Sequence, residues 1–181
     1  MAITKIQSES LNLADTYNFT GDVTGAGGVN TPAFLVTRNS TQGFNEATNT
    51  KVQFNNEIYD TDNTFDSSTN YRWTPAVSGK VFMSASADIN VGGSNAFYVK
   101  IEIYKNGTKI SRVARQTTDY LFPANTLQHI AIATHDTCNT TDYYEVYVNA
   151  NNVSGNNDCN VGTNSSSMVY ACHFGGYKII E

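Results

Sequence analysis

Charged residues are scarce in this chain, and the basic ones form no run. Only 15% of the 181 residues are charged, and 11 scattered lysines and arginines face 16 acidic residues, which gives a net charge of -5. A protein that follows a phosphate backbone needs clustered Lys and Arg to displace counterions. The composition therefore predicts no nucleic-acid binding.

Long apolar stretches are also missing. Residues 1–10 contain no apolar segment of signal-peptide length, and no window of the sequence approaches the length needed to span a bilayer. We therefore expect synthesis in a cytoplasm and no membrane insertion.

Cysteine is too rare for a disulfide framework. Cys138, Cys159 and Cys172 cannot all pair within one chain, and no Cys/His spacing predicts a zinc site. Only one expected strand, 143–149, separates Cys138 from Cys159, and it would hold them about 20 Å apart, beyond disulfide reach. We expect buried free thiols.

No convincing amphipathic helix occurs, whereas 11 tyrosines, 9 phenylalanines and many β-branched residues favour strands. The clearest strand is 80–90, in which odd positions from Val81 to Ile89 are apolar and even positions are polar except Phe82. Short strands separated by Asn/Gly/Ser/Thr turns predict an all-β sandwich or barrel. The expected strands are 33–37, 51–54, 71–73, 80–90, 97–105, 108–115, 127–134, 143–149 and 168–180.

Residues 1–28 are interpreted as an extended N-terminal arm that ends in a glycine hinge, followed by a head domain over residues 29–181. The apolar residues of the arm are isolated, so they need another surface against which to be buried. Gly25-Ala26-Gly27-Gly28 supplies the hinge. The residues expected to anchor the arm are Ile3, Ile6, Leu11, Leu13, Tyr17 and Phe19.

Catalytic residues are hard to find. The three histidines lie in no recognisable motif: His129 and His173 fall within expected strands, where a hydrogen-bonded sheet histidine is the commoner explanation, and His135 begins an expected loop. We predict that the protein is not an enzyme.

A cofactor is not expected either, although one acidic segment invites a test. Asp60, Asp62 and Asp66 offer oxygen ligands of the kind that suits calcium, but the spacing lacks the bidentate glutamate of a calcium loop. We favour a turn in which Asp and Asn side chains bond their own backbone, with calcium as the alternative.

From residue 32 to residue 180 the order of motifs resembles the jelly-roll domain of the complement one-q and tumour necrosis factor superfamily. The residues that carry the resemblance are Ala33-Phe34, Val52-x-Phe54-Asn55, Tyr59-Asp60, Phe65, Tyr71-x-Trp73, Pro75-x-x-x-Gly79, Lys105-Asn106-Gly107, Tyr144-x-Val146-x-Val148 and Phe174-Gly175-Gly176-Tyr177-x-Ile179-Ile180. The chain departs from that pattern at Val81 and Met83, where the family has aromatic residues, and at 134–142, where an expanded loop replaces a short turn.

The resemblance implies a jelly-roll β-sandwich that assembles as a homotrimer, with the inner sheets of three subunits around a three-fold axis. Such a seam requires apolar residues outside the core of each subunit. Alternation of side chains along the strands gives Phe82, Ile130, Ile132, Tyr170 and Tyr177 as the expected trimer-interface residues.

The arm is similar to N-terminal segments of tail-fibre and other structural proteins of marine bacteriophages. This similarity implies a virion surface protein, bound to major capsid or tail proteins through the arm. It would either decorate and cement the capsid or form a fibre tip that adsorbs to a host glycan or receptor. The alternatives are a soluble or secreted complement one-q-like module that binds a glycan or protein, and a glycan-degrading enzyme.

Overall fold

The computed structural model describes residues 30–91, 96–116, 127–152, 159–162 and 171–180, and these form 13 strands. None of the described segments is a helix, so no apolar helix long enough to cross a bilayer occurs among them. The arm-anchoring residues between Ile3 and Phe19 lie outside the described residues, as does Tyr170.

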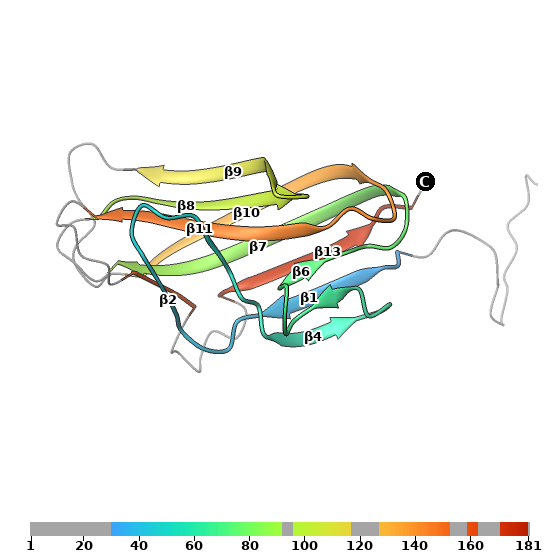
Figure 1. The fold of residues 1–181 in the computed structure, drawn as a ribbon, viewed down its shortest axis with the longest axis horizontal. Coiled ribbons are helices and arrows are strands. Elements are labelled where there is room, and N and C mark those ends of the chain that lie inside the picture. The colour runs from blue at the N-terminus through green and yellow to red at the C-terminus, as the bar shows by residue number, and fades with distance from the viewer. Residues whose placement is uncertain (1–29, 92–95, 117–126, 153–158, 163–170, 181) are drawn as a thin grey trace, which may run out of the picture.

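The strands form two sheets that pack face to face (Figure 1). The seven-stranded sheet A has the order β2 (Gln42–Phe44), β12 (Cys159–Val161), β7 (Gly79–Val91), β13 (His173–Lys178), β1 (Ala33–Thr37) and β4 (Asn56–Asp60), with β10 (Leu127–Cys138) also paired to β7. The six-stranded sheet B has the order β5 (Phe65–Asp66), β6 (Arg72–Trp73), β11 (Tyr144–Asn152), β8 (Ala96–Lys105) and β9 (Thr108–Gln116), with β3 (Thr50–Lys51) beside β11. Every paired strand is antiparallel.

Alternating side chains of the two sheets fill the space between them. From β7 the odd residues Val81 to Val91 are buried there, as the period of two predicts, and an aromatic cluster fills one end. Phe34 is its centre, with ring centroids 4.7 Å from Trp73 and 4.9 Å from Phe174. Aromatic pairs at these separations add about 0.5–1.5 kcal/mol each beyond the burial of their area.

The two ends of the described chain meet at one end of the sandwich. In Figure 1, β1 begins and β13 finishes at the same end, where Lys178 N donates to Pro32 O and Ile179 N donates to Lys80 O. The start of the described chain therefore lies beside the end of β13.

Two sequence predictions about local structure are confirmed. Asn106 and Gly107 form the turn between β8 and β9 with φ of 50° and 76°, which only residues tolerant of left-handed backbone adopt readily. All three cysteines are buried free thiols, and Cys138 and Cys159 pair with Gly79 and Val91 at opposite ends of β7, about 40 Å apart at the usual strand rise.

Several strand boundaries were predicted wrongly. Residues 134–138 are not part of an expanded loop: β10 stays paired with β7 from Leu127 to Cys138, because β7 itself extends to Gly79. The short strands β2, β4, β5 and β12 were missed, since strands of two to five residues carry too few alternations to show a period. The strand expected over 51–54 ends at Lys51, and β13 begins only at His173.

Candidate interaction surface

The outward face of sheet A carries apolar and aromatic side chains that do not belong to the core. Register places Phe82 between His135 of β10 and Tyr177 of β13. The Phe82 ring centroid lies 5.1 Å from that of His135 and 5.3 Å from that of Tyr177. With Leu35 and Tyr59 on the neighbouring strands, these residues form what we call the sheet A patch.

A hollow of about 160 Å³ opens within the sheet A patch, between Leu35 and Tyr59 on one side and Phe82 and Tyr177 on the other. Gly175 helps to keep it open, because a Cβ at this position would lie 3.2 Å from Leu35 Cδ1 and from the Phe34 carbonyl oxygen. Ser84 and His173 also line the hollow, so it could receive a side chain from another molecule that combines apolar and polar atoms.

The outward row of β10 extends this apolar character along the edge of the sheet. Leu127, Ala131 and Ala133 are all exposed, and Leu127 keeps 48% of its surface in solvent. Small side chains on an exposed strand allow the backbone of a partner to approach closely. The outward face of sheet A thus has an exposed ridge on β10 and a hollow over β1, β4 and β13.

The structure sorts the predicted interface residues into two groups. Phe82 and Tyr177 lie together on the outward face, outside the core of the single chain, and their place in a trimer interface stays a prediction. Ile130 and Ile132 were assigned wrongly, since each is only 4% exposed and belongs to the core of the single chain. The reason is register: they pair with Ala87 and Ala85, whose side chains point between the sheets.

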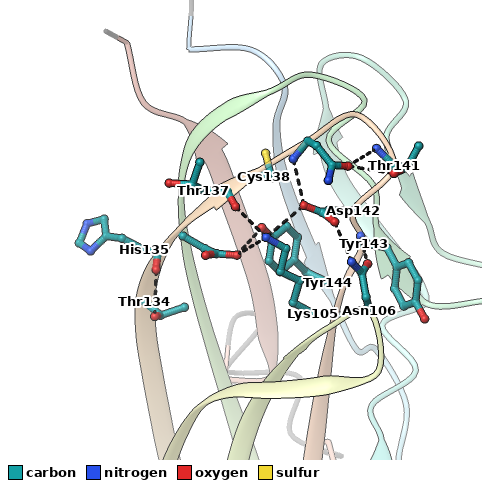
Figure 2. A network of polar contacts seen from close by, with 12 residues as sticks. Lys105, Asn106, Thr134, His135, Thr137, Cys138, Thr141, Asp142, Tyr143 and Tyr144 are labelled. Atoms are coloured by element: carbon teal, nitrogen blue, oxygen red, sulfur yellow. Dashed lines mark hydrogen bonds and ion pairs between the residues drawn. The ribbon is translucent and has the colours of Figure 1, made fainter.

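Sequence reasoning missed Leu35, Tyr59 and His135 as members of this surface. Tyr59 lies on the unpredicted strand β4, where an alternation over 56–60 was the only available signal. His135 was placed at the start of a loop, but it lies within β10 and faces outward beside Phe82. Figure 2 shows its imidazole projecting away from the polar cluster on the other side of that strand.

The other two histidines also face outward from sheet A, and both are hydrogen-bonded. His129 Nδ1 lies 2.7 Å from Asp88 Oδ1, and His173 Nδ1 lies 2.8 Å from Ser86 Oγ. Ser86 is 1% exposed and donates to the carbonyl of Ala171, so this hydroxyl is closed to a substrate. These contacts fit hydrogen-bonded sheet histidines better than an acid, a base and a nucleophile arranged for catalysis.

A cluster of polar side chains joins β8, β10 and β11 near the end of the sandwich where the chain termini meet (Figure 2). Lys105 Nζ lies 3.0 Å from both Asp136 Oδ2 and Asp142 Oδ2, and it donates to the carbonyl of Thr137. Tyr144 OH donates to Asp136 Oδ2 over 2.7 Å. The backbone N–H of Asn139 and the other donors around Asp142 lower the pKa of that carboxyl. The cluster holds three strand ends together and offers no free reactive group.

Replacement of Asp142 by Asn should show how much this cluster contributes to stability. The carboxylate accepts from Asn139 N and Asn106 Nδ2, and an amide would turn a donor toward one of them. We expect the free energy of unfolding at pH 7 to fall by about 1–3 kcal/mol in urea denaturation. Because the folded pKa is lowered, the stabilisation is present above the unfolded value of about 3.9 and is lost as pH falls through the folded pKa. A gap between the two proteins that stays constant down to pH 2 would contradict this account.

Two of the three acidic residues proposed for calcium, Asp60 and Asp66, already accept hydrogen bonds from backbone N–H groups. Asp60 accepts from the N–H groups of Asp62 and Phe65, and Asp66 accepts from those of Ser68, Thr69 and Asn70. These bonds, that to Thr69 first, hold the pKa of Asp66 far below its usual range. Within the described ranges, no three His, Cys, Asp or Glu residues gather closely enough to hold a metal ion.

We accordingly expect EDTA to leave the melting temperature of the purified protein unchanged, because the Asp60 and Asp66 carboxylates are already used to hold their own turns. Thermal unfolding with and without EDTA, followed by readdition of calcium, is the measurement. A melting temperature that falls with EDTA and recovers with calcium would establish a metal site.

Comparison with known proteins supports the architecture. No family model matches the chain, and no curated protein matches its sequence. Among solved structures, the globular domain of zebrafish complement 1qA protein is 17% identical, with a TM-score of 0.51 over 82% of this chain and 97% of that domain. Murine APRIL is 8% identical with a TM-score of 0.56, and Eiger TNF from S. frugiperda is 7% identical with a TM-score of 0.57. Each match covers 81% of this chain and at least 91% of the other.

The predicted fold is therefore confirmed. Two antiparallel sheets with this strand order, matched over almost the whole length of complement one-q and tumour necrosis factor-like domains, form a jelly-roll β-sandwich of that type. At 7–17% identity these comparisons support the fold and carry no information about function.

Proposed function

We propose that this protein is a homotrimeric surface protein of a bacteriophage particle, and that it binds other molecules without catalysing a reaction. The observation that carries the proposal is the sheet A patch, in which Phe82 and Tyr177 lie together outside the core of the single chain. An outward sheet face that combines an aromatic group, a hollow and an exposed aliphatic ridge fits a subunit interface.

A second copy of the same chain is the occupant that fits this face. A three-fold ring needs two different patches on each subunit, because its contacts are heterologous. Sheet A offers both: the ridge of Leu127, Ala131 and Ala133 at the β10 edge, and the hollow beside Tyr59 near the other edge. When the ridge of one subunit packs over the hollow of the next, three copies close around an axis.

The particle role rests on the N-terminal arm. Its sequence is similar to segments of bacteriophage structural proteins, and the head presents its N-terminal side beside its C-terminus (Figure 1). An arm bound to capsid or tail proteins would hold that end of the head to the particle and direct the opposite end outward. Both capsid decoration and host adsorption at a fibre tip agree with this arrangement.

A second candidate is a complement one-q-like binding module that acts apart from any particle. The observation behind it is the fold similarity to the globular domain of zebrafish complement 1qA protein, which spans 97% of that domain. The two candidates share the trimeric head and differ in location. Purified particles that contain the protein support the first, and particles that lack it support the second.

The trimer itself is tested by light scattering coupled to size-exclusion chromatography. We expect a mass three times the 19.8 kDa of the chain. A mass equal to one chain at micromolar concentration would refute the proposed interface.

A further inference from the structure

Two carboxylates are buried on the face of sheet B that points away from the core. Along β8 and β11 the residues Ile101, Ile103 and Val146 point inward, so Glu102 and Glu145 between them point outward. They are nevertheless only 2% and 6% exposed. Glutamate is almost never this deeply buried unless it is paired, so their surroundings are specifically built.

The surroundings are a network that fixes aromatic side chains on the surface. Lys109 Nζ lies 3.1 Å from Glu102 Oε1, and Lys51 Nζ lies 2.7 Å from Glu145 Oε1. Tyr104 OH donates to Glu102 Oε2, Tyr147 OH donates to Glu145 Oε2, and the two rings lie 4.4 Å apart. The phenols are thereby held in one arrangement, which pre-organises the face for contact.

The same face carries more cations than anions. Its two carboxylates, Glu102 and Glu145, are outnumbered by four basic side chains: Lys51, Lys100, Lys109 and Arg112. The local charge is therefore +2, on a chain whose net charge is -5. Lys100 lies over the Tyr98 ring at 4.1 Å, and Arg112 is exposed with no ion-pair partner among the described residues. These two side chains are free to meet an anion.

We propose that the outward face of sheet B binds an acidic polysaccharide. Lys100 and Arg112 meet its carboxylate or sulfate groups, and the tyrosine rings contact the apolar faces of the sugars. Two free cations are too few for a nucleic-acid backbone, whose binding needs a longer basic track. The proposal goes beyond the trimer and does not depend on it, since a single chain carries the whole face.

The test is affinity electrophoresis of the full-length protein in gels that contain alginate, dextran sulfate, neutral dextran or single-stranded DNA. We expect retardation by alginate or dextran sulfate and none by dextran or DNA; the first two separate carboxylated from sulfated ligands. Retardation by neither acidic polysaccharide overturns the proposal, and so does equal retardation by DNA.

Two double variants that each remove two positive charges distinguish binding by this face from an effect of net charge. Lys100→Gln with Arg112→Gln removes two charges from sheet B, and Lys80→Gln with Lys178→Gln removes two from sheet A. We expect the first pair to weaken binding about tenfold, as the loss of two exposed charged contacts should, and the second to change it less than twofold. Equal losses would overturn the proposal. If the first double variant unfolds, the single variant Arg112→Gln replaces it, because Arg112 is exposed. We then expect binding to weaken about threefold for Arg112→Gln and to stay unchanged for Lys80→Gln.

Discussion

Phe82→Asp is expected to split the trimer into folded monomers. In the single chain Phe82 is only partly buried, so an aspartate at this position can reach water. In the proposed interface the same side chain is covered, and a buried unpaired carboxylate costs several kcal/mol at each of three sites related by symmetry. Light scattering should change from the trimer mass to the chain mass, while circular dichroism should keep its β-sheet signal.

Ile110→Asp is the matched control, because Ile110 is an exposed aliphatic residue on β9 of sheet B, 39% exposed, away from the sheet A patch. It should leave the trimer intact. The assigned interface is wrong if Phe82→Asp remains a trimer, or if both variants dissociate to the same extent.

Deletion of the arm is expected to abolish attachment to the particle and to spare the head. The core of the described residues is built from strands that begin at Ala33, and these strands alone complete both sheets. Residues 29–181 should therefore melt within a few degrees of the full chain and keep the same oligomeric state. Co-sedimentation with particles that lack the native protein should fall to the background level.

A full-length chain with Lys5→Ala serves as the control for arm deletion, since it keeps all six apolar arm residues. It should sediment with particles as the wild type does. Should the truncated head attach as well as the full chain, the arm is not the anchor, and the particle contact must lie on the head.

The architecture could be predicted because its strongest signals are local. The alternation from Val81 to Ile89 and the Asn106-Gly107 turn both act over a few residues, and both are seen in the structure. The order of motifs then indicated which sandwich they build.

The residues of the outward face of sheet A could be predicted only in part, because alternation defines two faces of a strand without telling which one points inward. On β10, Ile130 and Ile132 were assigned to the outward face, and His129 and Ala131 alternate with them on the opposite face. Only the pairing of β10 with β7 shows that the isoleucines share a side with Ala87 and Ala85 and are buried. That pairing joins segments about 45 residues apart in the chain, and no local pattern encodes it.

The sheet B face was missed for a related reason. Glu102 and Glu145 lie in alternating strands, where a carboxylate usually faces solvent, and their partners Lys109 and Lys51 come from other strands. Burial of a carboxylate on an outward face depends on side chains that converge from four strands, which becomes visible only once the sheet is assembled.

The most direct test of the proposed function is a cryo-microscopy reconstruction of the bacteriophage particles that form when this gene is expressed during infection. We predict three copies of the head around a local three-fold axis, with the outward face of sheet A toward the axis and the N-terminal ends against coat or tail subunits. Particles without this protein, or heads that contact one another through sheet B, would contradict the account.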